Sequence, residues 1–177
     1  MTMHKEFDIP FLGLKLGQHS FEYQINNKFF ESFDYHEFNE AAITVTVVLN
    51  KMSTVMELEM NAKGTVNLAC DLTSEPFDQD ITASLALVIK FGDEFNNEDD
   101  EILVIPHGEH QINIAQYIYE MLVLAVPPKR IHPGVINGTL ESEALKKLEE
   151  LQPKETKKDK DTTDPRWDAL KDLLTDK

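Results

Sequence analysis

The stretch AITVTVVLNKMSTVMELEMNAKGTVNLACDLTSEPFDQDITASLALVIKF, residues 42–91, decides the fold. It is rich in Val, Ile and Thr, and its apolar residues recur at every second position, which is typical of strands with one buried and one exposed face. Gly64 is expected to break the run, because glycine weakens a strand interior. The sequence predicts strands at 42–49, 55–62, 65–70 and 82–91, with a fifth at 101–105.

The hydrophobic period changes after the last of these strands. Asn113 and Gln116 have the spacing of a capping box, and Pro127 and Pro128 are expected to stop the helix that follows. Its apolar face is formed by Ile114, Tyr117, Ile118, Met121, Leu122 and Ala125. The sequence therefore predicts an α+β fold, an antiparallel β-meander or a partly closed barrel-like sheet with helix 113–126 packed on its dry face.

The N-terminal third is less regular. Pro10 and Gly13 favour an extended segment or edge strand near the start of the chain. Alternating apolar residues predict a strand at 19–25, and Asn27 is a candidate cap for a short helix that contains Phe29, Phe30 and Phe33.

Charge divides the chain into an acidic body and a balanced tail. Residues 141–177 carry 9 of its 17 basic and 11 of its 32 acidic residues, so residues 1–140 carry 8 and 21, a net charge of −13. A body this acidic argues against direct binding to a phosphate backbone, which requires clustered positive charge. The tail is expected to hold a short charged helix at 141–151, a flexible linker at 152–163 and an amphipathic terminal helix at 164–177.

The terminal helix is the best-formed local unit of the tail. Asp164 is placed as its N-cap and Pro165 at its first position, and Trp167 and Leu170 begin its apolar stripe. A helix this short is marginal alone and must dock, either on its own body or on a partner. We expect a detachable recognition helix in which Trp167 is the anchor.

Candidate sites of chemistry are few. The chain has no Gly-rich phosphate loop, no GxSxG elbow and no HExxH motif, so we expect no enzyme, although an enzyme with an unrecognised site stays a rival. His107 and His110 lack further ligands nearby, and the acidic run at 93–101 lacks the pattern of a calcium loop, so we expect no metal and no cofactor. Cys70 lies beside Asp71 and Glu75, which argues for a partly buried structural thiol.

Lys129, Arg130 and His132 form the one compact basic cluster of the body. They are either solvated loop charges within 129–140 or a small contact for RNA or an acidic partner. With no long apolar run, a single cysteine and no signal peptide, the sequence predicts a soluble cytoplasmic protein that does not span a membrane.

Three segments occur in an order that resembles a known family. A strand runs into Cys70-Asp71-Leu72-Thr73 and then Glu75-Pro76-Phe77. A helix ends in Ile118-Tyr119-Glu120-Met121-Leu122-Val123-Leu124-Ala125-Val126-Pro127, with His132 soon after. The last segment is Asp164-Pro165-Arg166-Trp167-Asp168-Ala169-Leu170. Over roughly residues 60–175 this set resembles the YceD-like family, the large ribosomal RNA subunit accumulation proteins.

The resemblance is to a family pattern of a Cys-x-Arg-Cys-Leu turn, a Glu-x-x-x-Leu-x-Leu-Pro-type helix end and a terminal Asp/Asn-Pro-Arg/Phe segment. It makes Cys70, Asp71 and Thr73 the family-motif turn and Glu120, Leu124 and Pro127 the family-motif helix. The turn lacks the arginine and the second cysteine of the pattern, so it must hold by packing and hydrogen bonds alone.

The resemblance implies a non-enzymatic role in large-subunit ribosomal RNA accumulation. The expected partner is a basic ribosomal protein or the rRNA-processing machinery, with rRNA association at most indirect, because the acidic body repels bare RNA. A direct RNA-binding module built from Lys129, Arg130 and the lysine-rich 154–160 segment is the alternative.

Overall fold

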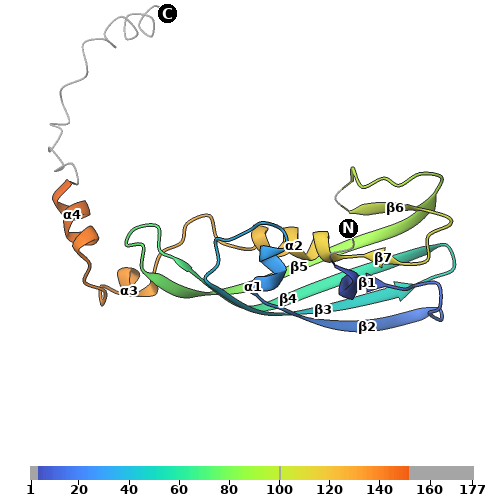
Figure 1. The fold of residues 1–177 in the computed structure, drawn as a ribbon, viewed down its shortest axis with the longest axis horizontal. Helices are drawn as coiled ribbons and strands as arrows, with labels where there is room; N and C mark the ends of the chain where they lie inside the picture. Colours follow the sequence, from blue (N-terminus) through green and yellow to red (C-terminus); the bar gives the residue numbers. More distant parts are fainter. Residues whose placement is uncertain (1–3, 100, 152–177) are drawn as a thin grey trace, which may run out of the picture. The chain divides into compact units, whose positions relative to one another are not determined.

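The computed structural model describes residues 4–99 and 101–151. The chain divides into two compact units, Met1–Leu140 and Glu141–Lys177. The first unit contains a five-stranded sheet in the order β2-β3-β4-β5-β6 (Figure 1). Its strands are β2 (Gly17–Ile25), β3 (Glu40–Lys51), β4 (Val55–Ala69), β5 (Pro76–Gly92) and β6 (Ile102–Pro106).

The first four strands pair antiparallel with their sequence neighbours, as the meander prediction requires. The predicted alternation is confirmed in β4, where Met56, Leu58 and Met60 are buried while Glu57 and Glu59 are exposed. Period-two patterning therefore identified the two faces of the sheet correctly.

The prediction that Gly64 breaks a strand is wrong. Gly64 lies within β4 and pairs with Ile43 and Ile81, so the four strands predicted between 42 and 91 are three longer ones. A Cβ at this position would lie 2.5 Å from the Cα of Ile43. Glycine is therefore needed here for the close approach of two backbones, which explains its presence in a long strand.

The fifth strand corrects the all-antiparallel prediction. β6 pairs parallel to β5, from Val88↔Ile102 to Gly92↔Pro106. Residues 93–101 lead the chain back along β5, and Asn96 forms a bridge with Val104 on the far side of β6. The side chains of Asn96 and Asp99 accept hydrogen bonds from the backbone N–H groups of Glu98 and Glu101, so polar residues of this acidic run stabilise its turns.

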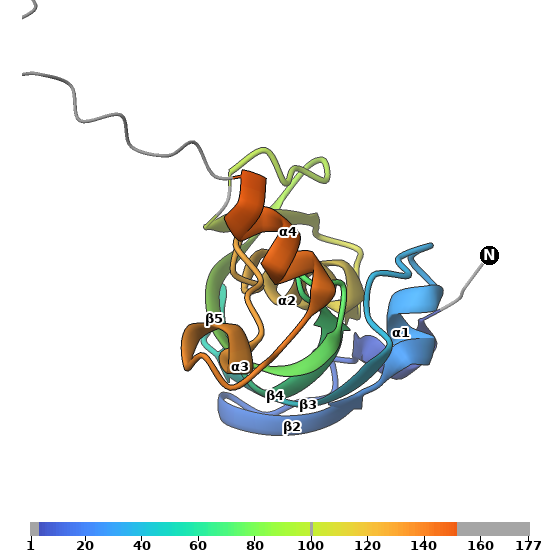
Figure 2. The ribbon, with the colours of Figure 1, turned by 90° about the vertical axis from the view of Figure 1, so that its left-hand side faces the viewer.

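The sheet is an open curved layer rather than a barrel, and helix α2 (Ala115–Leu124) lies in its hollow (Figure 2). Ile114, Ile118 and Leu122 are fully buried and Met121 is 7% exposed, so the predicted packing of this helix face is confirmed. The capping box does not form, because Asn113 accepts a hydrogen bond from the Ala115 N–H and Gln116 donates to Glu120.

The N-terminal segment closes part of the core. After the 3-10 turn η1 (Lys5–Phe7), strand β1 (Asp8–Ile9) pairs with β7 (Ile112–Asn113), just before α2. Helix α1 (Asn27–Glu31) begins after Asn26, whose side chain accepts from the Lys28 N–H, so the cap is Asn26 rather than the predicted Asn27.

The segment predicted as a loop at 129–140 contains the short helix α3 (Pro133–Ile136), whose N-cap is His132. In the second unit, α4 (Glu143–Leu151) has no buried residue. The predicted linker at 152–163 and terminal helix at 164–177 lie outside the described residues.

Candidate protein-binding surfaces

The Cys70 turn and the Lys129–His132 segment lie against each other. The N–H of Asp71 donates to the carbonyl of Arg130 over 2.8 Å, and the N–H of Arg130 donates to the Asp71 carboxylate over 2.7 Å. Ser74, at φ 59°, donates to the carbonyl of Cys70 and closes the turn. Two sequence motifs that lie 59 residues apart are thus joined by one backbone–backbone hydrogen bond and one hydrogen bond from a backbone N–H to a side chain.

Arg130 forms ion pairs with two carboxylates. Its Nη1 lies 2.8 Å from Oε2 of Glu37, and its Nε lies 3.2 Å from Oδ1 of Asp71. The hydrogen bond to Glu37 and the charge of Asp71 both raise the pKa of Arg130. The positive charge of the predicted basic cluster is therefore largely balanced within the body, while Lys129 beside it is exposed.

The environment of Cys70 differs from the one predicted. The thiol is buried, but the carboxylate of Asp71 is turned to Arg130, and Cys70 Sγ accepts a hydrogen bond from the His132 N–H at 3.3 Å. Burial alone would raise the pKa of Cys70, yet hydrogen bonds from the N–H of His132 and from Thr73 lower it. Thr73 is the residue at which the resemblance would place a second cysteine.

His132 and the family-motif helix have different environments. His132 Nδ1 accepts from the Gly134 N–H at 2.9 Å, and its ring packs edge-on against Phe77. Glu120 accepts from Gln116, Leu124 is 83% exposed, and the half-buried Pro127 follows the end of α2. Leu124 therefore faces solvent on a helix whose opposite side is core.

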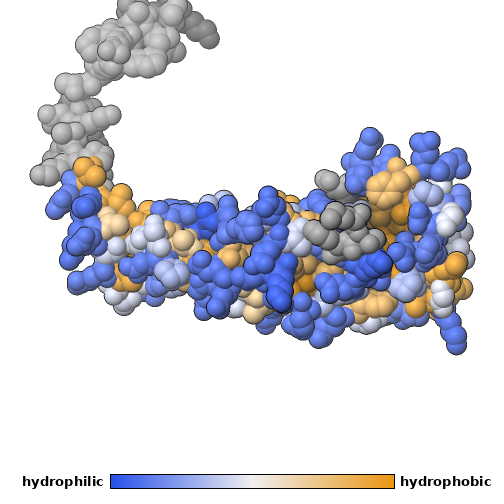
Figure 3. Space-filling view, in the orientation of Figure 1, coloured by the Kyte–Doolittle hydropathy of each residue, from blue (hydrophilic) through white to orange (hydrophobic). Residues whose placement is uncertain are grey.

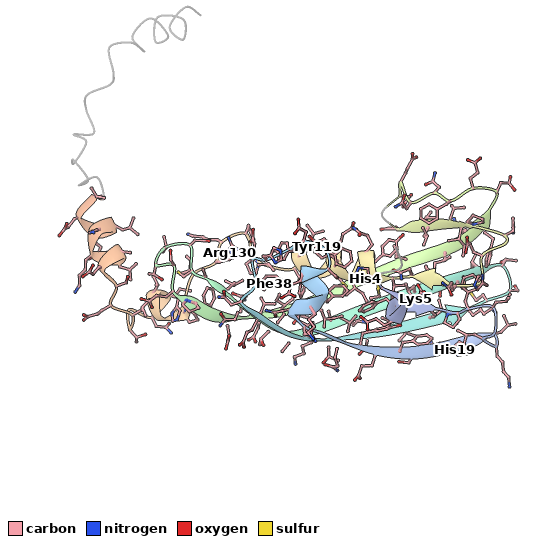
Figure 4. The ribbon with its side chains drawn as sticks, in the orientation of Figure 1. His4, Lys5, His19, Phe38, Tyr119 and Arg130 are labelled. Carbon is pink, nitrogen blue, oxygen red and sulfur yellow. The ribbon has the colours of Figure 1, made fainter. Side chains whose placement is uncertain are left out.

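A row of stacked rings joins His4 and Phe33, which follows α1, to α2. His4 stacks on Phe33 at 4.7 Å between ring centroids, and Phe33 stacks on Tyr119 at 4.4 Å. Tyr35 meets Tyr119 edge-on, and its pKa is raised by burial and by the adjacent Glu37. Figure 4 shows Arg130, Tyr119 and His4 along one side of the body and His19 near the beginning of β2. This cluster could not be predicted from the sequence, because its members are far apart in the chain.

The outer face of the sheet is exposed and acidic. It is formed by the residues that alternate with the core residues of β2 to β5. Two lysines, Lys63 and Lys90, stand on it against six carboxylates, a net charge of −4. The carboxylates are those of Glu22, Glu40, Glu57, Glu59, Asp78 and Asp80.

Neighbouring amides hold some of these carboxylates in place. Asn67 donates to Asp78 over 2.7 Å, and Asn50 donates to Glu57 over 3.1 Å. Because an amide is neutral, these hydrogen bonds orient the carboxylates without cancelling their charge. The sequence analysis found the acidity of the body but not its concentration on one face.

Among residues 4–99 and 101–151, no group of three or more His, Cys, Asp or Glu side chains is placed to hold a metal ion. His107 stacks on Phe91.

No helix in the same part of the chain has both the length and the apolar character to cross a membrane. Asp164, Pro165, Arg166, Trp167 and Leu170 lie outside the described residues, so their predicted role in partner binding stays a prediction.

The described residues thus define an α+β protein with an apolar inner face and a charged outer face on one open sheet. A family model, that of the large ribosomal RNA subunit accumulation protein YceD, matches residues 58–174. The match spans two thirds of the chain, so the chain belongs to the YceD family. The comparison with curated proteins and the comparison with solved structures each returned no match. Family membership implies a role in the accumulation of large-subunit ribosomal RNA.

Proposed function

We propose that this chain supports large-subunit ribosomal RNA accumulation as an acidic protein-binding factor. It holds a basic ribosomal protein or docks on a processing enzyme, and it contacts rRNA indirectly. The observation that carries the proposal is the outer face of the sheet, where six carboxylates stand against two lysines.

The electrostatics favour a protein partner over bare RNA. The body carries a net charge of −13. In its one compact basic cluster, Arg130 forms ion pairs with Glu37 and Asp71. RNA would have to approach against this field, whereas a cationic protein is attracted by it. The attraction between exposed charges falls with salt, because the screening length is about 10 Å at 0.1 M ionic strength.

The test is capture from a lysate at low and high salt, with and without nuclease, scored for ribosomal proteins and precursor rRNA. The wild-type chain is expected to capture a basic ribosomal protein or a processing enzyme at low salt after nuclease treatment. Glu57→Lys with Glu59→Lys should abolish capture, because it replaces two central carboxylates by lysines and brings the net charge of the outer face from −4 to zero.

The matched control is Glu149→Lys with Glu150→Lys on α4, which makes the same change in net charge at exposed positions of the other unit. It should leave capture unchanged if the outer face is the binding surface. Capture of precursor rRNA that nuclease removes together with every protein would contradict the proposal and favour the direct RNA-binding alternative.

A further inference from the structure

Strand β5 is paired along most of its length, Pro76–Lys90, on one edge but only at its end on the other. β4 pairs with it from Ala69↔Pro76 to Val55↔Lys90, whereas β6 pairs only with Val88–Gly92. Among the described residues, positions 76–87 of β5 therefore have a strand partner on one side alone. Such an edge presents unpaired N–H and C=O groups, the template for adding another strand.

On the inner side of this edge lies a groove of about 640 Å³ between β5 and α2, lined by both apolar and polar residues, among them Asn97, Asp99 and Glu120. Ala83 and Leu85 contribute from the strand, and Tyr117, Met121 and Leu124 from the helix. Leu124 is 83% exposed although it lies next to the core. An apolar side chain entering from an added strand would cover Leu124 and Leu85 together.

On the outer side of the same edge lies a second hollow, of about 660 Å³. Ser84, Ala86 and Val88 form part of it, and the acidic side chains that line it are Glu57, Glu59 and Glu101. Glu59 pairs across the sheet with Ala86. The side chain of Ala86 is only a methyl group, so it leaves the carboxylate of Glu59 open toward the free edge. A strand added to β5 would lie two strand spacings, about 10 Å, from β4, which carries Glu59. A lysine or arginine side chain on the added strand and the side chain of Glu59 together span this distance.

We propose that the free edge of β5 at residues 82–87 binds an extended segment of the basic partner as an added strand. The inference rests on the proposed function, since it names the site and the chemistry of that partner. Successive side chains of a strand point to opposite faces. The segment that fits therefore alternates apolar residues, which enter the α2 groove, with basic residues, which meet the carboxylates of the outer hollow.

Among the described residues, β2 is the other edge strand of the sheet and pairs with β3 alone, but none of its residues lines either of these two hollows. Figure 3 shows mostly hydrophilic residues on this side of the molecule, with several smaller hydrophobic patches, one of them near β6. Phe95 in the loop before β6 is 59% exposed, but β6 is already paired with β5 on one edge and bridged by Asn96 on the other.

The proposal is tested with synthetic peptides and the full chain, by fluorescence anisotropy at low salt. The first probe alternates lysine and valine. The second has the same composition with valines at helical spacing, and the third is the alternating peptide N-methylated at every residue, which removes the N–H donors of both edges. The alternating peptide should bind at least about tenfold more tightly than either of the others, because only it can offer both faces and pair its backbone. Equal binding of the three peptides would overturn the proposal.

Leu124→Gln on α2 tests the groove, and Ile136→Gln on α3 is its control, because both side chains are largely exposed, 83% and 72%. The first variant should weaken the alternating peptide about tenfold, and the second should leave it within about twofold. Equal effects of the two variants would overturn the site.

The lysate experiment separates this inference from the proposed function. Reduced capture by Leu124→Gln supports the added strand. If the wild-type chain captures a ribosomal protein after nuclease treatment and Leu124→Gln captures it equally well, the partner does not use this edge, while the proposed function stands. If the wild-type chain captures no protein, the proposed function itself fails.

Discussion

The two faces of the sheet are made from alternate residues of the same strands, yet they have opposite properties. On the inner face Val45, Val47 and Leu49 of β3 are inaccessible to solvent and pack into one core with α2. On the outer face Glu57 and Glu59 of β4 are exposed. Neighbours such as Leu58 and Glu59 therefore belong to different environments, although one peptide bond joins them.

This difference separates stability from recognition. Burial of the inner face supplies most of the favourable free energy of folding, whereas exposed charges contribute little to it. Inner-face substitutions should therefore change the free energy of unfolding, and outer-face substitutions should change binding. The following predictions test that division, from the largest effect to the smallest.

Met121→Asp should destabilise the protein most, by about 3 kcal/mol or more, because it buries an unpaired charge between α2 and the sheet. Leu124→Asp on the same helix should change stability by less than about 0.5 kcal/mol, since Leu124 is 83% exposed. Thermal and denaturant unfolding measure both. Equal melting temperatures for the two variants would show that α2 does not pack as described.

Gly64→Ala should cost about 1–3 kcal/mol, because the added methyl group collides with the backbone of β3. Gly108→Ala is the control, since a Cβ there meets nothing within 4 Å. Denaturant midpoints compare the two. A Gly64→Ala protein as stable as the wild type would place β3 and β4 further apart than the structure does.

The contact between Asp71 and Arg130 should show a coupling free energy of about 1 kcal/mol or less in a double-mutant cycle to alanine. The side chains are 36% and 31% exposed, so solvent screens their attraction. The coupling should shrink as salt is added. A coupling of zero at low salt would mean that the turn and the 129–132 segment are joined by their backbone contacts alone.

The outer-face variant Glu57→Lys with Glu59→Lys should have the smallest effect on stability, within about 0.5 kcal/mol of the wild type, because both side chains are exposed. Urea unfolding checks this. A loss of several kcal/mol would show that the outer face also stabilises the fold and would remove the division between the two faces.

Periodicity was sufficient to predict the core. The inner residues of β4 and the buried face of α2 follow from periods of 2.0 and 3.6, which are local properties of the backbone. The direction of β6 could not be predicted from periodicity. Parallel and antiparallel pairing with β5 would bury the same residues of this short strand. Gly64 was misjudged for a related reason, since only the neighbouring backbone of β3 shows why a glycine belongs inside a strand.

The candidate site was predicted in part. The sequence marked the Cys70 turn and Arg130 separately, but their contact and the ion pair with Glu37 depend on tertiary structure. The acidity of the body was evident from composition, whereas its position on one face required the register of the strands. The free edge of β5 was not detectable at all, because it depends on where β6 stops pairing.

The central claim is that the acidic outer face carries the role of this YceD-family chain in large-subunit rRNA accumulation. It is tested most directly by the ratio of large- to small-subunit rRNA in cells whose own copy is replaced by Glu57→Lys with Glu59→Lys, beside the Glu149→Lys with Glu150→Lys control. The ratio is expected to fall to the level of cells lacking the protein in the first strain and to stay normal in the second, at equal protein levels. A normal ratio in both strains would contradict it.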